Sequence, residues 1–457
     1  MSDQLNQWQQ QDAAHFLHPF TDTRSLGARG TRVITRAEGV YLYDAEGRQL
    51  LDGMSGLWCV AVGYGRKELA DVASRQIQQL SYYNSFFQCS TPPAIELAAK
   101  LAEVTPPQFQ HVFFTGSGSE SIDTIIRLAR RYWQLEGQPE RNILIGRWNG
   151  YHGSTIAGVS LGGMKWMQEQ GTVPLPGFAH INQPYWFERG GGLSPQEFGL
   201  AAARELEQKI LELGPDRVAG FIGEPIQGSG GVIIPPETYW PEIQRICDRY
   251  GILLISDEVI CGFGRTGQWF GCEYYGTRPD LMSVAKALSS GYLPIGGVMV
   301  GERVARKLID TGGEFYHGFT YSAHPVCCAV ALANLEIIQR ERLVENARDT
   351  AGPYLQQRWA ELGAHPLVGE VRGVGLLGAL ELVKSKSPLT WFEPRGKVGE
   401  RCRDNAILNG LVMRATRDTM IIAPPLVITK AQIDELVEKA WRTLDQTLAG
   451  LQQDGWL

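Results

Sequence analysis

The sequence of 457 residues has no long apolar run, no excess of basic residues and no paired cysteine motif. Without about 20 consecutive apolar residues, no segment is expected to span a bilayer as a helix. The formal net charge of -6 and the pI near 5.8 give no electrostatic reason to expect nucleic acid or an anionic membrane as a partner. The eight cysteines are scattered and form no Cys-x-x-Cys pair, which predicts reduced thiols in the cytoplasm. A small molecule is therefore the expected partner.

The start of the chain is polar and lacks the basic segment and apolar core of a signal peptide. With 44% hydrophobic and 20% charged residues, the chain can bury a sizeable core. Its length exceeds that of one ordinary compact domain, so we expect a large domain with a smaller companion.

Short apolar runs alternate with helical patterns through the middle of the chain. The runs lie at residues 111–114, 142–145, 218–222, 252–255 and 294–300, and the helical patterns include residues 120–133 and 239–250. This alternation is typical of an α/β fold in which helices cover a mainly parallel sheet. A long helical pattern beginning near Pro325 leads to a second, α+β part, with a helix near residues 350–362, strands near 371–375, 411–414 and 420–422, and a closing helix from Lys430.

Lys286 lies in a small, otherwise apolar stretch just after a probable strand. Desolvation lowers the pKa of a buried lysine and yields a neutral amine that can form a Schiff base. Upstream, residues 252–259 read as a buried strand ending in the carboxylates of Asp257 and Glu258. Together they suggest pyridoxal phosphate (PLP), whose ring nitrogen needs an acidic partner and whose aldehyde needs a lysine. Glu258 should point away from Asp257, because strand neighbours face opposite sides.

Residues 113–120 run from a strand through glycines into a helix. Such a junction offers free N–H groups and a positive helix end to a phosphate, with Gly118 and Ser119 as the best contacts. A dinucleotide site is the rival interpretation, but the loop lacks the third glycine of that motif. Taken alone, the loop is as compatible with an ordinary tight turn.

The motifs at residues 257–259 (Asp-Glu-Val) and 262–267 (Gly-Phe-Gly-Arg-Thr-Gly), followed by Lys286, resemble those of class III aminotransferases. Residues 57–59, 148–153 and 317–322 are most similar to the ω-transaminases that use pyruvate, including putrescine and diamine transaminases. The resemblance extends from Phe20 to the final helix. It implies the fold type I, aspartate aminotransferase-like architecture: a mainly parallel seven-stranded sheet plus a smaller α+β domain. The implied domains are residues 60–325 for the large one, with 1–59 and 326–457 forming the small one.

The resemblance also implies roles for the cofactor site. Lys286 would bind PLP covalently and then carry the proton between substrate and cofactor, and Asp257 would keep the ring nitrogen protonated. Tyr151 would stack on the ring, and His152 beside it is at least as well explained as a turn residue. Thr320 would reach the phosphate of the neighbouring subunit's cofactor, so the active site would exist only in a homodimer, either alone or paired into a tetramer. Each residue also has a plainer structural reading, such as a capping aspartate or a loop threonine.

For the substrate pocket, the resemblance implies that Arg414 binds the carboxylate of pyruvate and swings aside for an amine without one. An alternative is a surface arginine, with Arg417 close by. Trp58, Phe20 and Phe86 would form the aromatic wall, although aromatic residues are more often part of a core. No metal ligand set is expected.

Four positions bear on the subgroup. Ile260 favours the pyruvate-dependent enzymes, since many class III members have glutamine there. Ala323 stands where the subgroup usually has glycine, and would strain the loop if the position needs a positive φ. Ser55 and Ser229 replace the usual alanines and are expected to add hydroxyls near the pocket.

The sequence thus predicts a cytoplasmic PLP-dependent aminotransferase that moves an amino group from a primary amine to pyruvate. Putrescine or a similar diamine is the first candidate donor, followed by an arylalkyl amine or an ω-amino acid. Rivals in the same family are a 2-oxoglutarate-dependent transaminase and an aminomutase. An NAD-dependent dehydrogenase would leave Lys286 unexplained, and a catalytically silent regulator lacks a basic patch for DNA.

Overall fold

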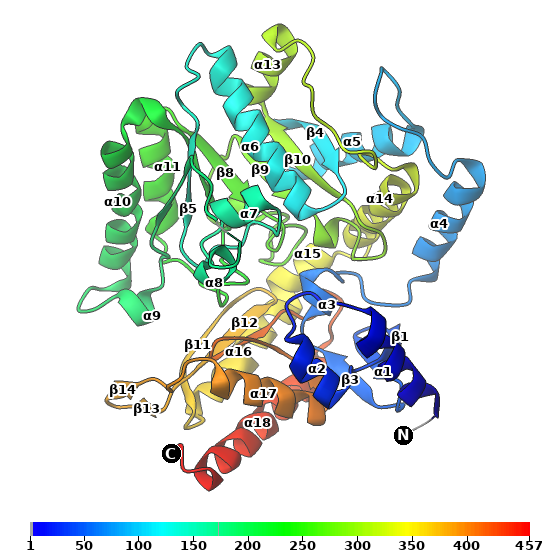
Figure 1. Cartoon of the computed structure of the whole chain (residues 1–457), viewed down its shortest axis with the longest axis vertical. Coiled ribbons are helices and arrows are strands. Elements are labelled where there is room, and N and C mark those ends of the chain that lie inside the picture. The colour runs from blue at the N-terminus through cyan, green and yellow to red at the C-terminus, as the bar shows by residue number, and fades with distance from the viewer. Residues whose placement is uncertain (1–2, 172) are drawn as a thin grey trace.

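The computed structural model describes residues 3–171 and 173–457 and centres on a seven-stranded sheet (Figure 1). β10 is antiparallel to both of its neighbours, and the other adjacent pairs are parallel. The strands, in spatial order, are β4 (Phe109–Thr115), β10 (Gly296–Gly301), β9 (Leu281–Val284), β8 (Leu253–Asp257), β7 (Val218–Gly223), β5 (Ile143–Arg147) and β6 (Phe178–Ile181). The predicted α/β fold with a mainly parallel sheet is confirmed.

Both faces of this sheet are buried, which explains the continuous apolar runs of its strands. Leu144 and Ile222 pack in one core cluster with α6 (Gly118–Leu135) and α13 (Glu302–Thr311). Their neighbours Ile145 and Phe221 point to the opposite face, where they pack with α10 (Pro195–Leu213) and α11 (Tyr239–Tyr250). In Figure 1, α6 crosses in front of the sheet while α10 and α11 lie at its left edge.

A further helical layer flanks the β4 edge of the sheet. The helix predicted near Pro325 is α14 (Pro325–Arg340), which contacts α4 (Lys67–Gln79) and α5 (Pro92–Val104). Proline suits the first position of a helix, where its missing N–H would have no partner anyway. The side chain of His324 caps this helix by accepting from the Val326 N–H at 3.3 Å.

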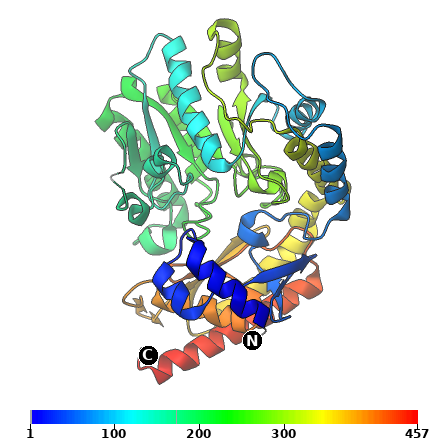
Figure 2. The same cartoon turned by 45° about the vertical axis from the view of Figure 1, so that its right-hand side comes forward.

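Two four-stranded sheets form the smaller part of the molecule. The first joins both ends of the chain, because β15 (Leu411–Val412) runs parallel to β3 (Gln49–Asp52), next to β2 (Tyr41–Asp44) and β1 (Ile34–Glu38). The second has the order β11 (Val368–Val374), β12 (Leu377–Leu382), β17 (Thr419–Ile422) and β16 (Arg414–Thr416). Figures 1 and 2 show the first helices beside the orange and red C-terminal segments.

The remaining elements are mostly short, apart from the closing helix α18. They are α1 (Asp3–His15), α2 (Thr23–Arg29), α3 (Ser55–Trp58), α7 (Ile156–Leu161), α8 (Lys165–Gln168), α9 (Trp186–Arg189), α12 (Gly271–Tyr274), α15 (Leu343–Glu345), α16 (Ala351–Ala360), α17 (Lys397–Leu408), α18 (Lys430–Gln453), β13 (Ser385–Lys386) and β14 (Leu389–Thr390). The eight cysteines are free thiols. Over residues 3–171 and 173–457, no helix has the length and apolar character needed to cross a membrane, and no cluster of His, Cys, Asp and Glu side chains is arranged to hold a metal ion.

One predicted boundary is wrong. The strand expected at residues 252–259 is β8, and it ends at Asp257. The Asp257 carboxylate accepts a hydrogen bond from the Val259 N–H at 3.2 Å, and this local bond turns the chain out of the sheet. The strand therefore ends with Asp257 at its carboxyl end.

Candidate active site

A cavity of about 1710 Å³ opens where the parallel strands end. Its lining includes Gly116, Asn149, Glu224, Val259 and Ala285, which lie one or two residues beyond the ends of β4, β5, β7, β8 and β9, as expected for a ligand site of an open α/β sheet. Most of the predicted site residues line this one cavity: Phe20, Trp58, Gly118, Ser119, Tyr151, Asp257, Lys286 and Arg414. Thr320 and Phe86 do not line it.

Lys286 lies two residues after β9, at the start of a short 3-10 helix, with a left-handed backbone (φ 48°). Its Nζ is 5.8 Å from the centroid of the Trp58 ring, and it forms no hydrogen bond or ion pair with any described residue. Burial lowers the pKa of the Lys286 ammonium, although Cys59 and Asp257 oppose this shift. This lowering of the Lys286 pKa is in the direction of the neutral amine that covalent chemistry needs.

Asp257 is buried and its carboxylate is held by three donors. Its Oδ2 lies 2.7 Å from Nδ1 of His152, while Oδ1 accepts from the Ser283 hydroxyl at 2.8 Å and from the Val259 N–H. Burial alone would raise the pKa of Asp257, but the contact with His152 and the other donors outweigh it, and the pKa is lowered. The carboxylate thus stays ionised and can pair with a cation in the cavity.

Two functional neighbours were missed or undervalued by the sequence analysis. His152 is only 2% exposed and contacts Asp257, so it is not a backbone-bonded turn residue. Glu224 follows β7, lines the cavity and accepts from the N–H groups of Tyr151 (3.1 Å) and Gly228 (2.9 Å). A carboxylate at the end of a buried strand is the signal that identified Asp257, and it could have identified Glu224.

The N-terminus of α6 faces the same cavity. Ser117 caps this helix by accepting a hydrogen bond from the Glu120 N–H. The N–H groups of Gly118 and Ser119, in the first turn, have no partner among the described residues. Gly153 (φ 109°) lets the following loop approach closely, since a Cβ there would lie 2.9 Å from that of Ser119. The arrangement offers free donors and a positive helix end to an anion.

Arg414 and Trp58 lie next to each other in the lining of the cavity. The Arg414 guanidinium lies 4.9 Å from the centroid of the Trp58 ring and has no hydrogen bond or ion pair within the described residues. Desolvation lowers its pKa, although Tyr151 and Glu224 oppose the shift. Arg414 is therefore half-buried and unpaired, whereas Arg417, on the rim, is exposed.

Tyr151 and Phe20 line the cavity from other sides. The Tyr151 hydroxyl lies 3.1 Å from the Ser154 hydroxyl, and Phe20, two-thirds exposed, packs edge-on against Trp166. By contrast, Phe86 borders a separate hollow with Arg127 and residues 314–318. Thr320, in the same region, is exposed, and its carbonyl accepts from the Tyr82 hydroxyl at 2.7 Å.

The expectations for individual positions have mixed outcomes. Glu258 does point away from Asp257: its carboxylate accepts from the N–H groups of Gly271 and Cys272, and burial raises its pKa to about 7. Ala323 has φ 56°, so the position does require a left-handed backbone.

Of the two serines expected near the pocket, only Ser229 lines the cavity. The expectation for Ser55 is wrong, because its hydroxyl is fully buried and donates to the Ala423 carbonyl at 2.6 Å. Ile260, which marks the subgroup, lines the cavity as a 5% exposed side chain.

A buried lysine, an ionised aspartate and an anion-binding helix end around one cavity of this fold define a PLP-dependent transferase of fold type I. The sequence model of the family "Aminotransferase class-III" matches residues 26–444, so the chain belongs to the class III aminotransferases. The predicted family, cofactor and enzyme class are confirmed.

Among its relatives, a putrescine--pyruvate aminotransferase from Pseudomonas aeruginosa is 58% identical over 97% of both chains. A diaminobutyrate--2-oxoglutarate transaminase from Halomonas elongata is 42% identical over 93% of this chain and 92% of its own. An (S)-enantioselective ω-transaminase structure from Thermomicrobium roseum has a TM-score of 0.94 at 45% identity, covering 97% of this chain and 98% of its own. The structure of the Pseudomonas jessenii ω-transaminase in complex with PMP has a TM-score of 0.95 at 42% identity, covering 98% of this chain and 99% of its own.

The residues present fit the PLP that this family uses. The unpaired amine of Lys286, the ionised Asp257 and the free N–H groups of Gly118 and Ser119 match the aldehyde, ring nitrogen and phosphate in chemical type. His152 and Ser283 hold the Asp257 carboxylate in place.

Proposed function

We propose that this aminotransferase moves the amino group of a carboxylate-free primary amine to pyruvate, giving an aldehyde or ketone and alanine. The unpaired Arg414 guanidinium in the cavity carries the proposal, because it is a receptor for the carboxylate of the acceptor that a simple amine donor does not need. The relative from Pseudomonas aeruginosa, a putrescine--pyruvate aminotransferase, supports putrescine or a similar diamine as the first donor to test.

When bound, PLP supplies an aldehyde that takes up the amine and a ring that accepts the electrons released from the substrate carbon. Lys286 holds the cofactor and, once released, its neutral amine takes the proton from that carbon and returns it at the neighbouring position. Asp257, kept ionised by His152 and Ser283, stabilises a proton on the ring nitrogen. Gly118 and Ser119 bind the phosphate through their free N–H groups.

Arg414 and the aromatic wall select the substrates. The guanidinium binds the pyruvate carboxylate with two parallel hydrogen bonds, and its stacking on Trp58 keeps it inside the cavity. With an amine donor, the flexible side chain moves aside and the carbon chain contacts Trp58 and Phe20 instead. Tyr151, which lines the same cavity, would hold the cofactor ring by stacking.

The same proposal includes a homodimer with shared active sites. Thr320 and Phe86 lie away from the cavity of their own chain, in a region of exposed aromatic side chains that includes Phe87, Tyr316 and Tyr321. Pairing of this region with a second copy would bury those side chains and bring Thr320 to the partner's phosphate site and Phe86 to its substrate wall. We also propose residues 60–325 as the large domain and a cytoplasmic location, in line with eight free thiols.

The test is a visible absorption spectrum of the purified enzyme, recorded before and after putrescine and again after pyruvate. The cofactor band should bleach with the amine and return with pyruvate, and alanine should accumulate in turnover. Replacing pyruvate by 2-oxoglutarate separates this enzyme from the rival transaminase type. A band that returns only with 2-oxoglutarate, or no alanine across a panel of amine donors, would refute the proposal.

A further inference from the structure

The cavity is larger than PLP and a four-carbon amine require, since cavities for small ligands measure about 300–1,000 Å³ and this one about 1710 Å³. Beyond Arg414 the cavity continues along β16 and reaches residues of the neighbouring strands of the second small sheet. Polar side chains line this extension: Gln183, Tyr185, Glu188, Glu381, Arg395 and Thr419. None of them has a role in the chemistry described above.

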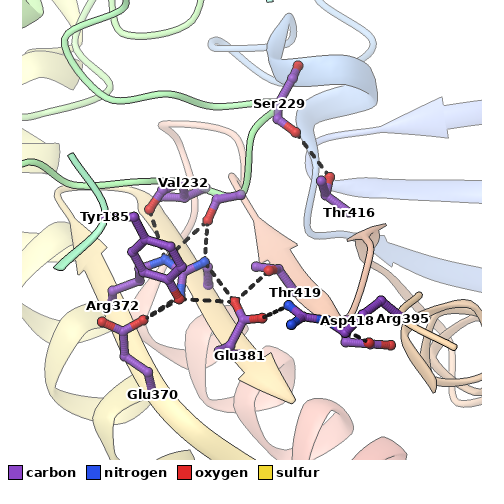
Figure 3. A network of polar contacts seen from close by, with 12 residues as sticks. Tyr185, Ser229, Val232, Glu370, Arg372, Glu381, Arg395, Thr416, Asp418 and Thr419 are labelled. Carbon is purple, nitrogen blue, oxygen red and sulfur yellow. Dashed lines mark hydrogen bonds and ion pairs between the residues drawn. The ribbon is translucent and has the colours of Figure 1, made fainter. Parts of the chain in front are cut away.

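Glu381, on β12, is 2% exposed and contacts Tyr185, Arg395 and Thr419 of this lining (Figure 3). Its Oε2 accepts from the hydroxyls of Thr419 (2.6 Å) and Tyr185 (3.2 Å) and from Arg372 (3.2 Å). Within the described chain, its Oε1 has only Arg395 as a partner, at 3.6 Å, which is too long for a hydrogen bond. One carboxylate oxygen is therefore saturated, whereas the other has a long ion pair and no hydrogen bond.

Further acceptors lie close to Tyr185 in the chain. Gln183 is 7% exposed, and its buried Oε1 has no hydrogen-bond partner in the described structure. Glu188 is exposed and forms no ion pair with any described residue. An unpaired buried acceptor costs free energy unless a ligand donates to it.

The charges around Glu381 also favour a cation. The connected network contains two arginines, Arg372 and Arg395, against three carboxylates, those of Glu370, Glu381 and Asp418. Figure 3 shows Glu381 between the two arginines, with Asp418 on the far side of Arg395. Within this network the carboxylates exceed the arginines by one, and Glu188 adds a further negative charge. Elsewhere on the lining, Arg403 is paired with Asp404 and Glu400 with Lys397, while Arg414 and Arg417 carry positive charge outside the network.

Strand register fixes the distance of Glu381 from Arg414. Thr419 pairs with Glu381 on one side and with Thr416 on the other, and Arg414 lies two residues before Thr416. With strands about 4.8 Å apart and a rise of about 3.3 Å per residue, the Cα atoms of Arg414 and Glu381 are about 12 Å apart. A four-carbon diamine spans only about 6 Å at roughly 1.2 Å per bond. A donor that extends from the Arg414 position to Glu381 therefore needs a longer chain.

We propose that Gln183, Glu188 and Glu381 form a distal acidic site that binds the far ammonium of a long diamine or polyamine donor. The inference rests on the proposed function, because the near amine must react at Lys286. An ammonium has three N–H donors and no acceptor, which suits the free Glu381 oxygen, the Gln183 carbonyl and the Glu188 carboxylate. Putrescine would react without reaching the site.

The test compares α,ω-diamines of four to ten carbons with n-alkylamines of equal length, using pyruvate as acceptor. For the longest chains, the diamine should exceed the monoamine in kcat/KM by roughly tenfold, and Glu188→Gln or Gln183→Leu should each remove much of this advantage. Turnover of the monoamines should change by less than about twofold, since their methyl end has no N–H group to donate to these acceptors. Glu140→Gln, at an exposed position outside the cavity, is the matched control.

Glu381→Gln tests the centre of the site, with its fold checked by circular dichroism because Arg372 depends on this carboxylate. Binding of 1,10-diaminodecane and decylamine to the Lys286→Ala holoenzyme, measured by calorimetry, gives a readout without turnover. Equal losses of kcat/KM for diamines and monoamines in the variants would overturn the inference. A preference for long ω-amino acids over long diamines would also overturn it, because a carboxylate at the far end of the donor would bind Arg395. If no amine yields alanine with the wild-type enzyme, the proposed function itself fails.

Discussion

Replacing Arg414 by alanine should separate the two half-reactions of this enzyme. The Arg414 guanidinium lines the cavity without an ion pair among the described residues, and it lies 4.9 Å from the centroid of the Trp58 ring. A hydrogen bond to a charged group contributes about 1.5–3 kcal/mol. At the lower end, appropriate for a half-buried side chain, two such bonds to pyruvate amount to about 3 kcal/mol, or roughly a 100-fold loss in kcat/KM.

The amine half-reaction should be much less sensitive. A donor without a carboxylate loses only a wall contact, so its rate of cofactor bleaching should fall by less than about threefold. Stacking of a cation on an aromatic ring at such a site contributes about 0.5–1 kcal/mol, so the variant should also remain folded. Arg414→Lys keeps the charge but not the two parallel donors, and should lose roughly tenfold with pyruvate.

The assay is single-turnover spectroscopy, with the amine step followed by bleaching and the pyruvate step by return of the band. Arg417→Ala, on the exposed rim three residues later, is the matched control and should leave both steps nearly unchanged. Equal losses in the two steps for Arg414→Ala would show that this arginine supports the cavity in general and does not recognise the carboxylate.

Four further predictions concern the cofactor site and the fold. Lys286→Ala should fold but lose at least about 10³-fold in turnover, as expected when the covalent anchor and proton carrier is removed, and near-normal turnover would exclude this role. His152→Ala removes a contact of 2.7 Å to the Asp257 carboxylate and should weaken PLP binding by about tenfold in a titration of apoenzyme, whereas unchanged affinity would make the contact irrelevant. Ala323→Gly should raise the urea midpoint by relieving about 1 kcal/mol of left-handed backbone strain at φ 56°, and a lower midpoint would contradict that strain. Burial raises the pKa of Glu258 to about 7, so the folded state binds more protons than the unfolded state between about pH 4.5 and 7. This carboxyl therefore lowers the stability of the fold as the pH rises through that range. Glu258→Gln should flatten the decline in the free energy of unfolding measured with urea, and an unchanged dependence on pH would refute this role.

Local patterns in the sequence are sufficient to predict the central strands and the positions of Asp257 and Lys286. The central strands appear in the sequence as short apolar runs between helical patterns, and Asp257 and Lys286 stand at or just after the ends of two such runs. By contrast, the sequence analysis predicts no strand at residues 377–382, where β12 places Glu381 inside an apolar run. Burying that carboxylate depends on Arg372, Arg395 and Thr419, which come from other parts of the chain.

Long-range pairs are the other feature that a single sequence does not reveal. His152 and Asp257 are separated by 105 residues, and neither position alone indicates that the two side chains meet. Likewise, Ser55 was expected to lie at the pocket because of its neighbours in sequence. Its hydroxyl is instead directed to the Ala423 carbonyl, 368 residues away, and also lies 3.3 Å from the guanidinium of the buried Arg265.

Backbone strain links the catalytic lysine to the rest of the fold. Lys286 and Trp58 both have a positive φ, and neither residue type adopts it readily, at a cost of about 1–3 kcal/mol each. Such conformations persist only when the surroundings fix them. The Asn334 side chain on α14 donates to the carbonyls of Ala287 and Leu288, at 2.8 and 3.0 Å, and so anchors the turn that carries the lysine. Because α14 begins five residues after Thr320, this one helix connects the lysine turn to the segment proposed to reach the partner subunit.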